Sequence, residues 1–299
     1  MQASEHLDSF SMLPITMTAA IQEDIRDTNI TEAEPEKVTG ITGRAITPVI
    51  TVTAMAMDMK MFRANSLTAV RKKKVIDIHT HLIPGIDDGC GSLEETKKVC
   101  WLMRSQGVDR IIATPHFYAD STDPKEFLRK RNEAFKRMGD LVSKYNIRKG
   151  AEVRYFTGIG RADDIELLKI DRSDFMMLEL ADKRINEIVI DDLMELRSRD
   201  IRPIIAHLNR YSEFNNDRFI EFCNMNSILI QLNTECLFSF FQRRRALELI
   251  RTGAVQFIAT DCHDAERRRP NLKEAFDVIR AHLGDDVAEE FAENEDRII

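Results

Sequence analysis

The 299-residue chain lacks several features that would each assign it to a class of protein. It has no apolar run of roughly 18 residues, so nothing in it predicts a membrane-spanning helix. Its five cysteines form no close pairs, which argues against a disulfide framework and indicates a reducing compartment. No basic patch precedes an apolar core at the N-terminus, so no secretory signal is predicted. These absences predict a cytoplasmic protein.

Basic residues are outnumbered by acidic ones, and aromatic residues are few. Against 50 acidic residues stand 43 Lys and Arg, and aromatics make up 7% of the chain. A nucleic-acid surface usually needs an excess of basic residues with interleaved aromatics, so we expect no nucleic-acid partner. The hydrophobic fraction, 43%, is ordinary for a globular protein. Nothing in the sequence predicts an oligomeric state.

Residues 1–74 differ from the rest of the chain. They are rich in Thr, Met, Ile and Glu, and a possible strand at 46–52 has no obvious partner. The basic run 71–74 is typical of a solvated edge before a buried strand. We interpret 1–74 as a poorly ordered extension, or as the product of an upstream start, with a regulatory arm as the alternative. The folded domain is then predicted to be 75–299.

From residue 75 onward, short apolar runs alternate with amphipathic segments. The expected strands are 75–78, 110–114, 147–152, 175–179, 203–206, 228–232 and 255–260. The expected helices are 92–106, 124–144, 187–200, 216–225, 239–252 and 271–282, with a further one at 284–294. Six of the seven strands precede a helix long enough for a right-handed crossover, which predicts a parallel sheet. About 225 residues suit a closed seven-stranded (β/α) barrel better than an open sheet.

Ligand-type side chains fall at the ends of these expected strands. They are His79, His81, His116, Glu152, Glu179, His207, Asp261 and His263. The carboxyl ends of parallel barrel strands converge on one face, so these residues are expected to meet in one pocket. Two residues apart on an extended segment, His79 and His81 point to the same side, and Asp77 could orient one of them.

Imidazole and carboxylate donors without organised thiolates suit Mn, Fe or Zn in a reactive site. Eight donors exceed what one ion requires, which favours two or three ions that share a bridging carboxylate. Such ions lower the pKa of bound water from about 15.7 to roughly 7 and clamp phosphate oxygens. Arg210 and Arg268 could add bidentate phosphate contacts. The predicted chemistry is hydrolysis of a phosphate ester.

At this point the motifs resemble a known family. The segment 77–89, with the sequence DIHTHLIPGIDDG, is similar to the opening motif of the polymerase-and-histidinol-phosphatase (PHP) superfamily. More narrowly, it resembles the bacterial protein-tyrosine phosphatases of capsular polysaccharide synthesis. The later motifs TPHF at 114–117, GAEV at 150–153, AH at 206–207 with RY at 210–211, and TDCH at 260–263 follow in the same order. The resemblance covers about 75–295.

This resemblance implies a distorted seven-stranded barrel with two or three metal ions, commonly manganese. One ion would be held by His79, His81, Glu152 and Asp261, and Glu152 would bridge to a second ion held by His116 and His207. The remaining shells would be completed by Asp88, Glu179 and His263. Catalytic roles would fall to Arg210, Arg268 and Asp88. The implied partner is a phosphotyrosine protein, a bacterial tyrosine kinase that controls polysaccharide export.

Two motifs depart from the usual family pattern. His-Pro-Glu-Arg-Tyr is replaced by HLNRY at 207–211, and Ser-Asp-Ala-His-Asn by TDCHD at 260–264. The ligand types survive in both, so metal binding is still expected, whereas Leu208 and Asn209 could alter specificity. The N-terminal 74 residues have no counterpart in the family pattern.

Three rival interpretations remain open at this level. Cys262 and Arg268 satisfy the Cys-x5-Arg pattern of cysteine-based phosphatases, but Asp264 and Glu266 would repel a phosphate from that loop. Small-molecule phosphatase activity, such as histidinol phosphate hydrolysis, is a closer rival. The third is a metal-binding regulatory module with little turnover.

Overall fold

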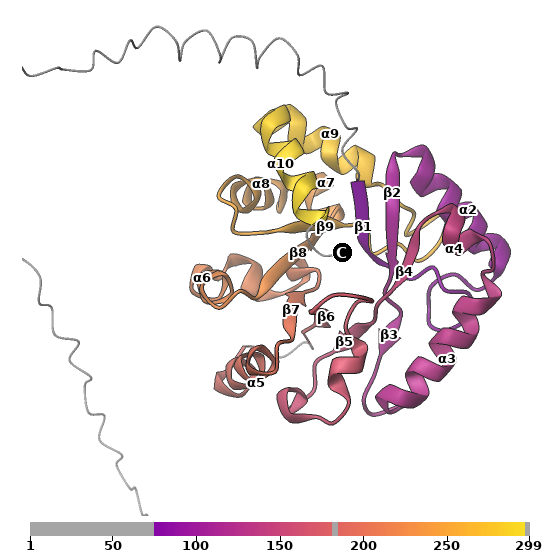
Figure 1. The fold of residues 1–299 in the computed structure, drawn as a ribbon. Helices are drawn as coiled ribbons and strands as arrows, with labels where there is room; N and C mark the ends of the chain where they lie inside the picture. The colour runs from indigo at the N-terminus through magenta and orange to yellow at the C-terminus, as the bar shows by residue number, and fades with distance from the viewer. Residues whose placement is uncertain (1–74, 181–184, 297–299) are drawn as a thin grey trace, which may run out of the picture. The chain divides into compact units, whose positions relative to one another are not determined.

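The computed structural model describes residues 75–180 and 185–296 of the chain (Figure 1). The expected extension 1–74, with the candidate strand 46–52, lies outside the described residues. Among the helices that are described, none is long and apolar enough to cross a membrane.

The described residues alternate strands and helices in the predicted order. The strands are β1 (Val75–Thr80), β2 (Val108–Ala113), β3 (His116–Phe117), β4 (Ile147–Lys149), β5 (Glu152–Arg154), β6 (Phe175–Glu179), β7 (Arg202–Ile205), β8 (Leu229–Asn233) and β9 (Phe257–Ala259). The helices are α2 (Leu93–Ser105), α3 (Pro124–Arg137), α4 (Leu141–Lys144), α5 (Glu187–Ser198), α6 (Asp217–Met225), α7 (Glu235–Phe238), α8 (Arg243–Arg251), α9 (Leu272–Leu283) and α10 (Asp285–Asp296). Short 3-10 turns are η1 (Ile159–Arg161), η2 (Ile165–Leu168), η3 (Leu208–Arg210) and η4 (Ser212–Asn215).

Local signals explain where several elements begin and end. The Ser92 hydroxyl accepts a hydrogen bond from the backbone N of Glu95 at 3.2 Å, which confirms the predicted cap of α2. The strand expected at 110–114 corresponds to β2, and a further short strand, β3, follows Pro115, which has no N–H to donate. The expected helix 124–144 is wrong as one element, because it divides into α3 and α4 around Gly139, whose φ is +53°. The helix expected at 239–252 begins only at Arg243.

All strand pairs are parallel and form two sheets, in the orders β1-β2-β4 and β3-β5-β6-β7-β8-β9. On one side, the chain itself joins the two sheets, because β2 continues into β3 through 114–115 and β4 continues into β5 through 150–151. On the other, the backbone N of His81 donates to Cys262 O at 2.8 Å, beside a parallel bridge of Thr80 to Cys262.

Successive residues of each strand point to opposite faces of the sheet, and the two faces belong to separate apolar clusters. The smaller one is Ile76, Ile78, Ile112, Ile170, Phe175, Met177, Ile204, Ala206, Phe257 and Ala259. It contains no helical residue, whereas the larger cluster contains the buried faces of the helices that flank the strands in Figure 1. A sheet that buries one face among its own strands and the other under helices has the layering of an α/β fold. Because the strands are parallel, their carboxyl ends lie on one side, where polar residues replace the apolar ones.

Candidate metal centre

All nine side chains predicted as metal ligands come together at these strand ends. They form four overlapping groups, in each of which the ligand atoms lie within 4.8 Å of one another. The groups are His79, His81 and Asp261; His79, Glu152 and His207; His116, Glu152 and Glu179; and His81, Asp88, His116 and His263. Residues more than 180 positions apart in the sequence thus share one site, as parallel strands allow.

Glu152, at the start of β5, is the centre of the cluster. Its Oε2 lies 3.2 Å from Nε2 of both His79 and His81, and 2.9 Å from Nδ1 of His116. Its Oε1 lies 2.7 Å from Nε2 of His207. Despite these short distances, Oε2 makes no hydrogen bond. A carboxylate oxygen facing three imidazole nitrogens in this way has the surroundings of a bridging metal ligand.

A second carboxylate, Asp261, closes the side of the site next to β1. Its Oδ1 lies 3.6 Å from Nε2 of His79 and 3.3 Å from Nε2 of His81, and these two nitrogens are 3.2 Å apart. Asp261 and His207 both have positive φ angles, +50° and +33°, in the left-handed region that non-glycine residues rarely adopt. Such strained residues concentrate at functional sites, where the fold holds the side chain in one direction.

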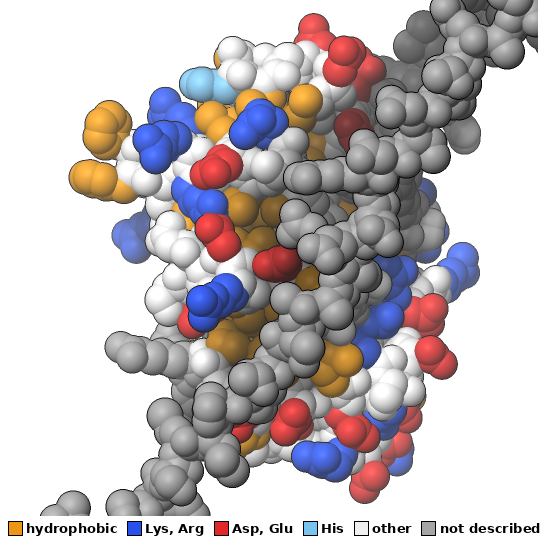
Figure 2. All heavy atoms as spheres, turned by 90° about the vertical axis from the view of Figure 1, so that its left-hand side faces the viewer, with side chains coloured by type: hydrophobic (Ala, Val, Ile, Leu, Met, Phe, Trp, Pro, Cys, Tyr) orange, Lys and Arg blue, Asp and Glu red, His pale blue; other side chains and the backbone are white. Residues whose placement is uncertain are grey.

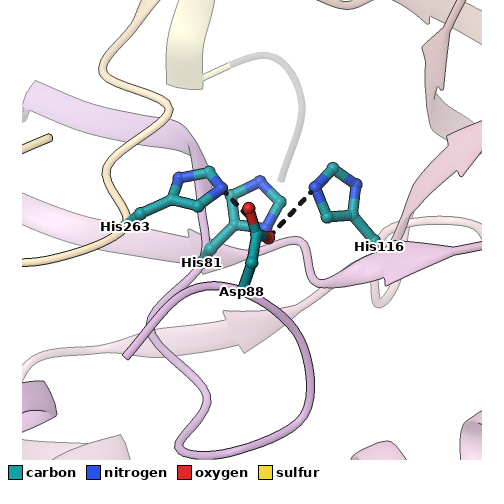
Figure 3. A group of neighbouring side chains, drawn as sticks. All are labelled: His81, Asp88, His116 and His263. Atoms are coloured by element: carbon teal, nitrogen blue, oxygen red, sulfur yellow. Dashed lines mark ion pairs between the residues drawn. The ribbon is translucent and has the colours of Figure 1, made fainter. Parts of the chain in front are cut away.

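Asp88 faces the imidazoles from the loop that follows β1. Its Oδ1 lies 3.4 Å from Nε2 of both His116 and His263, with His81 beside them (Figure 3). The loop can approach this closely because a Cβ at Gly89 would lie only 2.0 Å from the carbonyl oxygen of His81. Asp88 is 64% exposed, so this carboxylate is at the mouth of the site.

Glu179, at the end of β6, places its own carboxylate close to that of Glu152. Burial and the negative charge of Glu152 both raise the pKa of Glu179. Two carboxylates near each other in a buried place repel unless a proton or a cation lies between them. Glu179 therefore adds to the demand for positive charge in this part of the site.

The pKa values of the clustered side chains also indicate that the site needs positive charge. Burial opposes the charged form of Glu152, but the field of His79 holds the pKa of Glu152 well below its usual range. Burial also opposes the charged form of His81, yet its carboxylate partners, led by Asp261, raise the pKa of His81 well above its usual value. The carboxylates thus draw protons onto the imidazoles. Divalent cations can supply that positive charge in their place.

Unsatisfied polar atoms support the same interpretation. Among the described residues, the buried side-chain atoms without a hydrogen-bond partner include Glu152 Oε2, Glu179 Oε2, His263 Nε2, His116 Nδ1 and His207 Nδ1. An orphaned buried polar atom costs about 1–3 kcal/mol, so a cluster of them needs a compensating partner. Oxygen and nitrogen donors in this arrangement fit Mn, Fe or Zn ions.

Several residues orient the candidate ligands, and the sequence prediction missed them. Gln231 on β8 faces Nδ1 of His79 at 3.2 Å through Oε1, and Asp87 faces Nδ1 of His81 at 2.8 Å. The side-chain amide of Asn233 donates to Asp261 at 2.9 Å. Partners of this kind fix the tautomer and orientation of a ligand. The sequence does contain a signal for two of them, because Gln231 and Asn233 are amide side chains on β8, an otherwise apolar strand.

The expected role of Asp77 was wrong. Its carboxylate does not contact an imidazole ring and instead accepts hydrogen bonds from the backbone N of His79 at 3.4 Å and of Thr260 at 3.2 Å. A register shift between Asp77 and Thr80 interrupts the alternation of side chains that the prediction assumed. Asp77 consequently ties β1 to the segment after β9.

The two predicted arginines lie together at the rim of the site. A terminal nitrogen of Arg210 and one of Arg268 each lie 2.8 Å from Asp261 Oδ2. Arg268 also reaches to 4.0 Å from Asp88. Arg269 points away and pairs with Glu274 at 3.2 Å. Two guanidinium groups next to a cluster of this kind can bind a phosphate group.

Cys262 does not have the surroundings of a nucleophile. It is 1% exposed, and burial raises the pKa of its thiol well above the usual value. The carboxylate of Asp264 accepts hydrogen bonds from the backbone N of Glu266 and Arg267, both at 2.6 Å. Those amides would have to cradle a phosphate in a cysteine-based enzyme, and here a carboxylate occupies them.

The fold and the site together define an α/β protein with a candidate multinuclear metal centre at the carboxyl ends of parallel strands. The chain belongs to the family described as "Capsular polysaccharide synthesis, CpsB/CapC", whose model matches residues 75–299.

The chain is also similar to individual proteins named as tyrosine phosphatases. The chain is 28% identical over 243 residues to the tyrosine-protein phosphatase CpsB of Streptococcus pneumoniae, covering 75% of this chain and 98% of the relative. It is 22% identical over 234 residues to the tyrosine-protein phosphatase YwqE of Bacillus subtilis, covering 75% and 91%. Among solved structures, it is similar to one from a study of YwqE and CpsB, described as metal-dependent tyrosine phosphatases. The TM-score is 0.65 at 21% identity, over 75% of this chain and 93% of that one, which establishes a shared fold.

Proposed function

We propose that this protein is a metal-dependent phosphatase that hydrolyses phosphotyrosine on proteins. The observation that carries the proposal is Glu152 Oε2, which faces three imidazole nitrogens without a hydrogen bond, close to two rim arginines. Family membership and the names of the relatives support the same activity. Two or three divalent ions form the cofactor, with Mn favoured over Fe or Zn.

The nine clustered side chains divide into ligand sets for these ions. The first set is His79, His81 and Asp261, and Glu152 lies between it and the others. The second set consists of Glu152, Glu179, His116 and His207, and the third of Asp88, His263 and the imidazoles beside them. Compared with the pattern expected from the family, Glu179 joins the second set because its oxygen groups with His116 and Glu152.

When bound, the ions activate water as a nucleophile and stabilise negative charge on phosphate oxygens. The chain's own residues do the rest. Arg210 and Arg268 bind the phosphate group and orient it over the cluster, exchanging part of their contact with Asp261 for the substrate. Asp88, at the mouth beside His116 and His263, would hold a ligand position on the side from which the substrate enters. The ring of Tyr118, stacked on His116 with centroids 5.2 Å apart, forms an aromatic wall for the phenyl ring.

The domain that carries this site is a distorted seven-stranded barrel over 75–299, with 1–74 as an extension. If β2 with β3, and β4 with β5, are counted as single strands, seven parallel strands follow in order. The continuous runs of chain from β2 into β3 and from β4 into β5, with the hydrogen bond from His81 to Cys262, support closure of the ring. The enzyme acts in the cytoplasm, which the five free cysteines support. Its substrate is a tyrosine kinase of polysaccharide export.

The test is hydrolysis of three substrates by purified protein, together with metal analysis. With Mn²⁺, we expect turnover of p-nitrophenyl phosphate and of a phosphotyrosyl peptide, and little turnover of histidinol phosphate. Preference for histidinol phosphate would replace the protein substrate by a small molecule. Bound metal with no hydrolysis of any substrate would indicate a regulatory module.

A further inference from the structure

A pair of aromatic side chains projects from the bend between α7 and α8. Phe240 is 88% exposed and Phe241 is 90% exposed, the highest values among the large hydrophobic residues that the structure describes. Their rings meet edge to face with centroids 5.5 Å apart. Figure 2 shows hydrophobic side chains that project from the outline of this side of the molecule, next to Lys and Arg. Exposing two adjacent phenylalanines is unfavourable unless a partner covers them.

Several hydrogen bonds hold the bend that presents these rings. Arg243 donates from Nε to Leu237 O at 2.6 Å, and its backbone N donates to Ser239 O at 3.0 Å. The backbone N of Gln242 donates to the Ser239 hydroxyl at 3.4 Å. The guanidinium of Arg243 thus closes the turn from inside. A pre-organised surface of this kind binds a partner without first losing loop entropy.

The same bend is joined to the phosphate-binding rim of the candidate site. The side chain of Gln242 donates to Asn209 O at 2.8 Å, one residue before Arg210. Glu235, the first residue of α7, accepts from Nε of Arg210 at 3.3 Å. Two hydrogen bonds thus connect the segment 235–242, which carries Phe241, to the residues around Arg210.

Charge on the bend narrows the choice of partner. Arg244 is exposed and makes no ion pair with any described residue, whereas its neighbour Arg245 pairs with Asp217 and Glu248. Arg244 thus adds positive charge beside the two rings, and the carboxylate of Glu235 on α7 is paired with Arg210. A peptide that carries phosphotyrosine, an acidic residue and an apolar residue has the complementary chemistry.

We propose that Phe240, Phe241 and Arg244 form a docking surface for the segment of a phosphoprotein that flanks the phosphotyrosine. An apolar side chain of the substrate, in the segment that flanks the phosphotyrosine, packs on the two rings. This inference rests on the proposed phosphatase function, and it adds a sequence preference that the metal cluster alone does not supply.

The experiment compares two synthetic phosphotyrosyl peptides that differ only in having Leu or Ser at the flanking positions, each with one Asp beside the phosphotyrosine. In the Mn²⁺-loaded wild type, we expect kcat/KM for the Leu peptide to exceed that for the Ser peptide by about tenfold or more, because the rings bury an apolar side chain. The double variant Phe240→Ser/Phe241→Ser should lose that advantage and keep its rate on p-nitrophenyl phosphate.

A matched control removes an exposed apolar side chain elsewhere. Met225 ends α6 and is 77% exposed, so Met225→Ser should leave both peptide rates unchanged. Circular dichroism checks that each variant is folded. Arg244→Gln should lower kcat/KM for both peptides and leave p-nitrophenyl phosphate unaffected.

Other results would overturn the docking surface. Equal rates for the two peptides in the wild type, or retention of the Leu preference by the double variant, would remove it while the phosphatase function stands. A change from oligomer to monomer in the double variant would assign the rings to self-association. Loss of binding to vesicles of anionic phospholipid would assign them to a membrane surface. Failure of the wild type to hydrolyse both p-nitrophenyl phosphate and the peptides would instead contradict the proposed function.

Discussion

Glu152 and His207 are joined at 2.7 Å through Oε1 and Nε2, while the other oxygen of the same carboxylate makes no hydrogen bond. One half of the carboxylate is thus placed by the protein and the other half is left for a ligand. This division is what a bridging metal ligand requires. The negative charge of Glu152, and not only the shape of its side chain, should therefore be needed to hold metal ions.

Glu152→Gln retains the shape and removes that charge. We expect the metal content to fall and kcat to drop by more than the roughly 10–100-fold that loss of an outer-shell partner costs. Metal analysis of the purified variant, with hydrolysis of p-nitrophenyl phosphate, measures both. Glu166→Gln, on η2 and half-exposed, is the matched control. Full metal content and near-normal turnover in Glu152→Gln would rule out a bridging role.

Chelation and alkylation should have opposite effects. Removing divalent ions with EDTA should abolish hydrolysis, and added Mn²⁺ should restore it. Iodoacetamide should leave activity intact, because Cys262 is buried and its thiol pKa is raised well above the usual value. Cys262→Ser should likewise remain active. Activity that survives EDTA and is lost to iodoacetamide would indicate a cysteine mechanism.

Much of this architecture could be predicted because strands and ligands leave local signals. Apolar runs of strand length, separated by capped helices, predicted the parallel order that the structure confirms. Histidines and carboxylates just beyond those runs predicted a shared site, since parallel strands bring their carboxyl ends together. His79 and Asp261 lie far apart in the sequence, yet the position of each at the end of an expected strand was enough to predict both as metal ligands.

The remaining features depend on tertiary register, which the sequence does not display. Gln231 and His79 face each other only because β8 lies beside β9 and the segment after β9 forms a bridge to the end of β1. The register shift after Asp77 turned that carboxylate toward Thr260, against the simple alternation of a strand. Which carboxylate faces the imidazoles and which joins two strands therefore depends on the tertiary structure.

Gln231 should act as a positioning residue. Its Oε1 faces Nδ1 of His79 and also accepts from the backbone N of His207 at 2.8 Å, so one side chain places two ligands. Gln231→Leu should weaken Mn²⁺ binding by about 10–100-fold. Gln231→Glu, which keeps the acceptor oxygen, should recover part of that loss. Calorimetric titration of metal-free protein measures both affinities, and an unchanged affinity in the Leu variant would exclude this role.

Tyr155 supports the fold outside the metal cluster. Its hydroxyl donates to the buried Asp192 at 2.9 Å, and burial together with this hydrogen bond raises the pKa of Tyr155 to about 12. A raised phenol pKa means that the folded state holds the proton more tightly. The stabilisation is therefore present below the ordinary value of 10 and is lost as the pH rises through about 12.

Tyr155→Phe should lower the free energy of unfolding by about 1–3 kcal/mol at neutral pH, because Asp192 loses a buried donor. Urea denaturation of the metal-free protein measures the change. Tyr145→Phe, at a buried tyrosine whose hydroxyl makes no hydrogen bond to a described residue, should stay within about 0.5 kcal/mol of wild type. Equal effects of the two substitutions would contradict the role assigned to the hydroxyl.

Arg268 and Arg267 are adjacent, but only Arg268 faces the cluster. Arg268 lies 2.8 Å from Asp261, whereas Arg267 is exposed and makes no ion pair with any described residue. Lysine keeps the charge but not the planar pair of donors that a phosphate accepts. Arg268→Lys should therefore reduce kcat/KM for aryl phosphates by about 10–100-fold, mainly through KM, with the metal content unchanged. Arg267→Lys should behave like wild type, and equal losses in both variants would mean that bulk positive charge, not a directed contact, binds the phosphate.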